Sequence, residues 1–173
     1  MKKFILTIAM LTVSLSASAQ WVAGGGYGNL SDEVDDLEVS EISLGMIYGS
    51  IGYLIEGEGN FTFLPELRLG FGVADDSMSV YGVGVKVEMD SVVEFSVRGQ
   101  YTFDSGFYLF ANPAFSRFAA TASAGSVSVS EDDWEFGFGG GAGYKFTQQL
   151  WGELAYEAYD GVDVLGFGFK YLF

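Results

Sequence analysis

The residues that could do chemistry in this chain are carboxylates, amides and cations spaced two apart within apolar segments. Glu66 and Arg68, for example, alternate with Pro65, Leu67 and Leu69. Strand side chains point alternately to opposite faces, so polar residues with this spacing share one face. The set on that face is Glu66, Arg68, Glu94, Arg98, Gln100, Glu135, Lys145, Glu153, Glu157 and Lys170. Gathered in one place, such groups can form ion pairs, hold a small polar ligand or line a path for ions.

The residue inventory argues against an enzyme. The sequence contains no histidine and no cysteine, so it lacks the commonest general base and the thiol nucleophile. The glycine cluster at 139–141 is not followed by the Lys-Ser/Thr pair of a phosphate-binding loop. We therefore expect no catalytic residues and no cofactor.

Acidic residues outnumber basic ones by 23 to 8, and the formal net charge is −15. This balance excludes nucleic acid as a partner. One acidic loop is expected after the first strand, with Asp32, Glu33, Asp35, Asp36 and Glu38. It lacks the fixed glycine and the twelfth-position glutamate of an EF-hand. A solvated loop is favoured over weak binding of Ca²⁺ or Mg²⁺, so no metal site is predicted.

The elements that carry these residues read as strands, most clearly in the last ten residues. Leu165, Phe167, Phe169, Tyr171 and Phe173 share one face, and Gly166, Gly168 and Lys170 lie on the other with Leu172. An aromatic face ending at a bare carboxy-terminus is unusual for a water-soluble protein. It is typical of a transmembrane β-barrel, where apolar residues face lipid and polar residues face the lumen.

The same alternation indicates eight strands in all. They are expected at 21–28, 41–55, 61–73, 92–103, 107–119, 134–146, 150–159 and 164–173. The first, third and fifth connections are long and acidic, whereas the second, fourth and sixth are short. Long outer loops and short periplasmic turns are the rule for outer-membrane barrels. The fold prediction is an all-β, eight-stranded, antiparallel up-and-down transmembrane barrel.

One segment leaves the strand count open. Odd positions stay mostly apolar from Ser79 to Phe103 without a break. We interpret 79–89 as an extension of the fourth strand above the membrane. The alternative is a ten-stranded barrel that also recruits 126–130.

Residues 1–19 have the pattern of a secretory signal peptide. Lys2 and Lys3 precede an apolar run at 4–15, and Ala17-Ser-Ala19 is a small-x-small cleavage site. A retained anchor is less favoured because the run is short. The expected mature chain, 20–173, is one barrel domain in the cell outer membrane.

Three stretches carry a family resemblance: Pro65-Glu-Leu-Arg-Leu-Gly-Phe-Gly72, Gly143-Tyr-Lys-Phe146 and Phe167-Gly-Phe-Lys-Tyr-Leu-Phe173. The chain resembles the small porin-family outer-membrane β-barrels of Gram-negative bacteria, which are related in architecture to the transmembrane domain of OmpA. The resemblance implies that Tyr171 and Phe173 form an assembly signal read by the barrel-assembly machinery. We also expect the barrel to contact outer-membrane lipid and lipopolysaccharide. We expect a monomer without a peptidoglycan-binding domain.

Eight strands leave a lumen that side chains alone can fill. Charges in so narrow a space must be paired or hydrated, because an isolated buried charge is costly. Neighbours such as Arg98 and Glu94 are the expected partners of Glu66 and Arg68. A polar plug is therefore favoured, and with it a non-enzymatic structural or surface-interaction role. The alternative is a small gated pore for ions or small solutes.

Overall fold

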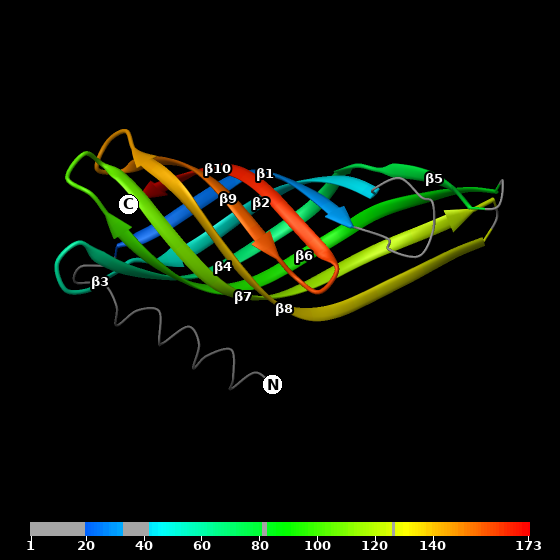
Figure 1. Ribbon diagram of the computed structural model, residues 1–173, viewed down its shortest axis with the longest axis horizontal. Coiled ribbons are helices and arrows are strands. Elements are labelled where there is room, and N and C mark those ends of the chain that lie inside the picture. The colour runs from blue at the N-terminus through cyan, green and yellow to red at the C-terminus, as the bar shows by residue number, and fades with distance from the viewer. Residues whose placement is uncertain (1–19, 33–41, 81–82, 126) are drawn as a thin grey trace, which may run out of the picture.

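The computed structural model describes residues 20–32, 42–80, 83–125 and 127–173, and all regular structure in these ranges is β-strand (Figure 1). The strands are β1 (Trp21–Asp32), β2 (Ile42–Tyr53), β3 (Ile55–Glu56), β4 (Phe61–Ala74), β5 (Asp76–Val80), β6 (Val83–Thr102), β7 (Phe107–Ala124), β8 (Val127–Lys145), β9 (Leu150–Ala158) and β10 (Val162–Leu172). No helix in the described ranges is long and apolar enough to cross a membrane, which says nothing about crossing by strands.

Eight of the strands close into an antiparallel barrel. The order around the ring is β1-β2-β4-β6-β7-β8-β9-β10, and β10 returns to β1 with Val22 opposite Leu172. The short strands β3 and β5 pair with β4 and β6 outside the ring. The prediction of an eight-stranded all-β barrel is confirmed, and the ten-stranded alternative is wrong.

Several strands are longer than predicted at one end. β1 continues to Asp32, and β7 and β8 form one hairpin that includes residues 119–133. The acidic run from Glu131 to Asp133 was expected in a loop but lies within β8. Residues 127–130 begin β8 rather than a ninth or tenth strand of the ring.

The segment 79–89 is divided between two strands. β6 begins at Val83, so its first part is the expected extension of the fourth ring strand. Ser79 and Val80 instead end β5, which runs antiparallel to β6 with Asp76 opposite Val87. The prediction was wrong for these two residues, because a short added hairpin strand has the same alternation as a continuous extension.

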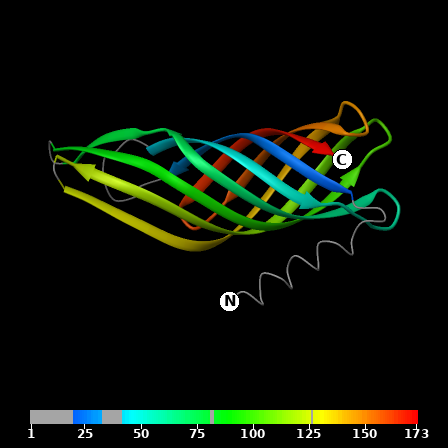
Figure 2. The ribbon, with the colours of Figure 1, turned by 180° about the vertical axis from the view of Figure 1, so that it is seen from behind.

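The two ends of the barrel differ in length and connections. The short-turn end holds Gln20, Phe173 and the turns at 57–60, 103–106 and 147–149. The long-strand end holds β5 and the far parts of β6, β7 and β8, which extend well past β9 and β10 (Figures 1 and 2). The Phe173 amide donates a hydrogen bond to the Trp21 carbonyl at 2.9 Å, which ties the residue after β10 to the start of β1.

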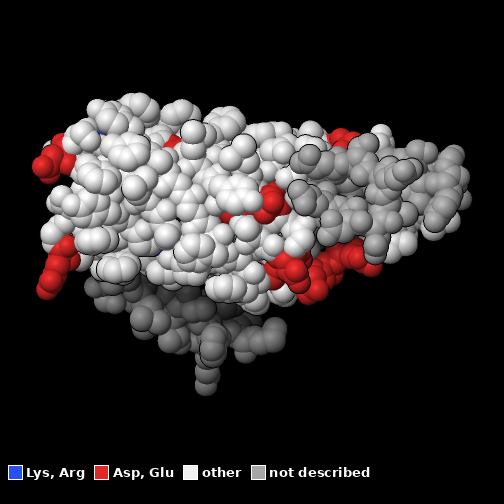
Figure 3. Space-filling model, viewed as in Figure 1, with Lys and Arg blue, Asp and Glu red and all other residues white. Residues whose placement is uncertain are grey.

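The outer face of the ring is apolar. Large side chains such as Phe71, Phe136 and Leu154 are 58%, 68% and 63% exposed. Figure 3 shows an uncharged band beside the short-turn end, with acidic atoms gathered toward the margins. An exposed aromatic band of this kind is stable in lipid and would be costly in water.

Inside, aromatic rings lie over glycines. Tyr108 occupies the space that a side chain at Gly143 would need, and Phe110 does the same at Gly141. A Cβ atom at Gly143 would also lie 2.7 Å from the Gly152 carbonyl oxygen. These glycines let large rings fill a narrow lumen.

Candidate functional site: the barrel interior

Arg68 of β4 lies at the centre of the interior and contacts two carboxylates. Its Nη1 atom donates to Glu94 Oε2 at 2.9 Å and to Glu157 Oε2 at 2.8 Å, and Nη2 donates to Glu157 Oε1 at 3.1 Å. All three side chains are at most 5% exposed. Charge-assisted bonds of this kind are strong, and β9 is thereby tied across the lumen to β4 and β6.

A second group of ion pairs lies beside the first. Arg98 binds Glu153 through two bonds, with Nη2 to Oε1 at 3.1 Å, and Tyr108 donates to the same carboxylate at 3.1 Å. Lys170 of β10 pairs with Glu66 and lies 3.7 Å from Glu153 Oε1.

The observed pairing differs in part from the expected one. Glu94 is the partner of Arg68, as the sequence suggested, but Glu66 pairs with Lys170 rather than with Arg98. The physical reason is that the lumen is narrow. A lysine on β10 can reach across to β4, so the two partners of an ion pair need not lie on adjacent strands.

Not all of the predicted polar face joins this network. Gln100 is buried, but its amide donates to Thr102 at 3.1 Å. Lys145 is half-buried, with its Nζ atom 4.7 Å from the centre of the Trp151 ring. Glu135 is half-buried and is not without interaction partners. The structure thus brings seven of the predicted residues into direct ion pairs: Glu66, Arg68, Glu94, Arg98, Glu153, Glu157 and Lys170.

Sequence reasoning missed several uncharged members of the network. Asn112 donates to Glu157 at 3.1 Å, Ser116 donates to Tyr159 at 3.0 Å, and the Tyr159 hydroxyl donates to Glu94 at 3.3 Å. Asn112 and Ser116 share the inward parity of Tyr108 on β7. Period-two alternation could therefore have identified them, as it identified Gln100.

Apolar layers lie on both sides of the ionic layer. Toward the short-turn end, the buried cluster consists of Val22, Leu54, Leu64, Tyr108, Phe110 and Trp151. Toward the long-strand end, it consists of Leu30, Leu44, Met46, Val92 and Val164. The ion pairs are consequently separated from solvent at each end by packed hydrocarbon.

The remaining predicted residues lie elsewhere or outside the described ranges. Tyr171 and Phe173 are exposed on the outer face at the short-turn end. Asp32 ends β1, whereas Glu33, Asp35, Asp36 and Glu38 lie outside the described residues, as does the expected signal peptide at 1–19. Within the described part of the chain, no three side chains of the metal-binding types gather into a group.

A protein-family model described as outer membrane protein beta-barrel domain matches residues 5–173. The chain belongs to this family. Membership places the barrel in the outer membrane. A comparison with curated protein sequences found no match.

Solved outer-membrane barrels share the fold. Neisserial surface protein A is 12% identical with a TM-score of 0.63, and Ail, the attachment invasion locus protein of Yersinia pestis, is 12% identical with a TM-score of 0.64; in both cases the alignment covers 90% of this chain and 99% of the other. The N-terminal barrel of Pseudomonas aeruginosa OprF is 15% identical with a TM-score of 0.57, covering 90% and 100%. At these identities the likeness concerns the fold alone.

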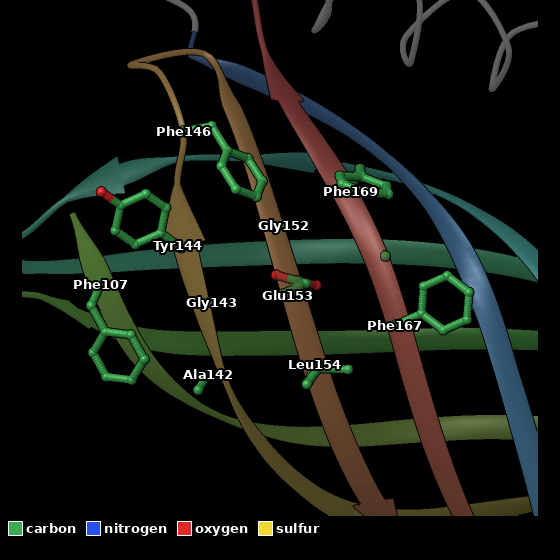
Figure 4. A pocket seen from close by; sticks show the side chains of 11 residues that line it. Phe107, Ala142, Gly143, Tyr144, Phe146, Gly152, Glu153, Leu154, Phe167 and Phe169 are labelled. Carbon is green, nitrogen blue, oxygen red and sulfur yellow. The ribbon is translucent and has the colours of Figure 1, made fainter.

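The outer-membrane barrel also carries a groove of about 390 Å³ on its outer face. Figure 4 shows the rings of Tyr144, Phe146 and Phe169 around the bare backbone of Gly143 and Gly152. The groove opens on the apolar band of the outer face. Glu153 of the ionic layer is among the residues that line the groove, but its carboxylate binds Arg98 on the lumen side of the sheet.

The strands beyond the apolar band carry exposed charged side chains whose pKa values are shifted. Backbone amides of Ser43 and Ser77 donate to Asp76 and lower the pKa of its carboxyl below 3.8. Hydrogen bonds to Asp75 and Glu88 raise the pKa of Lys86 to about 12. The Asp76 contact links β5 to the start of β2.

Proposed function

We propose that this protein is a closed outer-membrane barrel with a structural and surface-interaction role, and that it is neither a pore nor an enzyme. One observation carries the proposal: the interior is filled by an ionic layer between two apolar layers. An ion that passed through the lumen would have to lose its hydration shell at each of the two apolar layers. The desolvation cost of that passage is several kcal/mol or more.

The proposal assigns interaction to the strands beyond the apolar band. β6, β7 and β8 have 20, 18 and 19 residues, whereas β9 and β10 have 9 and 11. β8 pairs with β9 only from Phe138 onward. Among the described strands, the preceding residues of β8, 127–137, pair with β7 alone. They extend over roughly 36 Å at about 3.3 Å per residue, and a strand edge of this length can receive a partner strand.

The charge of this region limits the kind of partner. A solved complex of Ail contains the heparin analogue sucrose octasulfate, a polyanion. Here the long-strand end carries Glu131, Asp132 and Asp133 on β8. Like charges repel, so a polyanion is disfavoured and a cationic surface is favoured.

The non-enzymatic part of the proposal is supported by the composition. The whole chain has no histidine and no cysteine. The buried carboxylates Glu153 and Glu157 are held by arginines and enclosed by apolar layers, so substrate has no route to them. We further propose a monomer that contacts outer-membrane lipid and lipopolysaccharide through its apolar band.

Planar-bilayer recording tests the closed barrel. The purified wild-type protein is expected to give no steady conductance. Arg98→Ala is expected to stay closed as well, since both apolar layers remain. Combining Arg98→Ala with Trp151→Ala and Leu44→Ala, which thins both layers, is expected to admit ions. Large, steady channels in the wild type would overturn the proposal in favour of a pore.

Surface labelling tests the orientation. Because the chain has no native cysteine, single cysteines can be read without background. Glu131→Cys on β8 is expected to react with an impermeant maleimide on intact cells, whereas Asp104→Cys in a short turn is expected to react only after the outer membrane is opened. The reverse pattern would place the long strands in the periplasm and contradict the proposed surface role.

A further inference from the structure

The mouth of the barrel at the long-strand end contains an apolar cavity of about 150 Å³. Five strands contribute its walls, which include Leu30, Leu44, Val87, Met89, Phe118 and Val162. Its floor is the apolar layer that closes the lumen. We call this cavity the mouth socket.

A β-bulge creates the socket. Pairing between β6 and β7 shifts at Met89/Ser91, so that Met89 faces Ala120 and Ser91 faces Ala119. Past the shift, the inward parity of β6 changes from even to odd positions. Val87 and Met89 therefore point into the mouth, whereas Val92 points inward on the other side of the bulge.

Size and lining define what the socket can hold. A cavity of about 150 Å³ has room for a molecule the size of benzene. The walls offer almost no hydrogen-bonding groups, since Ser31 is the one polar side-chain type among the lining residues. A single aromatic or leucine-sized side chain fits this description, and a sugar or a charged metabolite does not.

The strands around the socket are acidic. Glu88 and Asp90 alternate with the lining residues of β6, and Asp163 follows Val162 on β10. Among the described residues of this end, the cations are Lys86 and Arg117. Each already pairs with acids of its own surface: Lys86 with Asp75 and Glu88, and Arg117 with Asp132. The strands that form the rim of the socket thus keep an excess of negative charge, which they carry on the face turned away from the socket.

We propose that the mouth socket receives one large apolar side chain from a cationic segment of an extracellular protein, which the acidic rim holds by charge. This inference rests on the proposed surface-interaction role and specifies its partner. A buried apolar anchor within a charged rim is the usual arrangement of a protein hot spot. A second copy of this barrel is disfavoured as the occupant, because two acidic mouths would repel.

The test uses the full barrel in lipid nanodiscs with a ¹³C-methyl label on Met89. The probe is the peptide Lys-Lys-Phe-Lys-Lys, compared with Lys-Lys-Ala-Lys-Lys and Glu-Glu-Phe-Glu-Glu. We expect the first peptide to shift the Met89 methyl signal saturably. The other two should bind at least about tenfold more weakly, because one loses the apolar anchor and the other reverses the charge. Added salt should weaken binding.

Two substitutions provide the matched control. Ala120 lines the socket, and its neighbour Ala119 points to the other face of β7. Ala120→Phe should fill the socket and abolish the Met89 shift, whereas Ala119→Phe should leave it. Unfolding curves of both variants establish that each is folded.

Three outcomes would overturn the inference. Equal binding of the Phe and Ala peptides would mean that charge alone acts. Binding that survives Ala120→Phe would place the contact outside the socket. A Met89 shift with benzene but with no peptide would make the socket a site for small hydrocarbons. Since none of these results concerns conductance, each is distinguishable from failure of the closed-barrel proposal.

Discussion

Substitution of Arg68 by alanine is the most direct perturbation of the ionic layer. Arg68 is 4% exposed and is the shared cation of Glu94 and Glu157. Its guanidinium also lies 4.7 Å from the centre of the Tyr48 ring. Arg68→Ala leaves two carboxylates, held close together by their common partner, without that cation and without access to bulk water.

The expected cost follows from the burial of these charges. Removing one partner of a buried ion pair typically destabilises a protein by about 3–5 kcal/mol. Replacing all of the charges by neutral groups of similar volume costs far less and can be favourable. The triple variant Arg68→Met, Glu94→Gln, Glu157→Gln should therefore recover most of the stability that Arg68→Ala loses. Such strong non-additivity is the signature of a coupled network.

Equilibrium urea unfolding in lipid vesicles, followed by tryptophan fluorescence, measures the free energy of unfolding of the single and the triple variant. Lys86→Ala is the control, because Lys86 pairs with acids at a side-chain exposure of 48% and exposed pairs contribute little. The reasoning is refuted if Arg68→Ala unfolds at the wild-type urea concentration. It is equally refuted if the triple variant is less stable than the single one, since that would mean that the two buried carboxylates do not destabilise the fold when their cation is removed.

Three other predictions concern the walls and the two ends. Gly143→Val should lower stability by about 1–3 kcal/mol through overpacking against an interior ring, whereas outward-facing Gly99→Ala, 3.9 Å from its nearest neighbour, should not; urea unfolding compares them. The lowered pKa of Asp76 means that its bond to the Ser43 amide is present above pH 3.8 and lost as pH falls through the folded-state pKa. Asp76→Asn should accelerate hydrogen exchange of that amide at neutral pH, and an unchanged rate would contradict the assignment. Deletion of Phe173 should reduce outer-membrane accumulation, measured by fractionation, if the barrel-assembly machinery reads this residue.

Period-two alternation was sufficient to predict the ring and its polar interior. Glu66 and Arg68 on β4 are two residues apart, and Glu153 and Glu157 on β9 are four apart, so the members of each pair lie on the same, inward face of their strand. The exact pairs could not be predicted in the same way. Parity gives the face of a strand, but it does not give the distance across the barrel, which decides that Lys170 reaches Glu66.

The segment of β6 around the bulge shows most clearly what period-two alternation cannot predict. Odd positions are mostly apolar from Ser79 to Phe103, so a continuous strand would place these apolar residues on the outer face. The bulge between Met89 and Ser91 inserts one residue and reverses the faces beyond it. The bulge does not interrupt the alternation in the sequence, because odd positions are apolar on both sides of it. On the side of the short-turn end they face the outer apolar band, and on the side of the long-strand end they face the mouth socket.

The same bulge connects the fold to the proposed function. Without the inserted residue, Val87 and Met89 would face outward above the membrane, where hydrocarbon has no partner, and Glu88 would point into the mouth. With it, apolar side chains complete the upper closure of the lumen, and the carboxylates stay on the solvent side of the extended sheet. The one residue that the bulge inserts therefore decides between a closed barrel with an apolar socket and a barrel with a charged, hydrated entrance. That is why closure and the surface site are expected to depend on the same short stretch of β6.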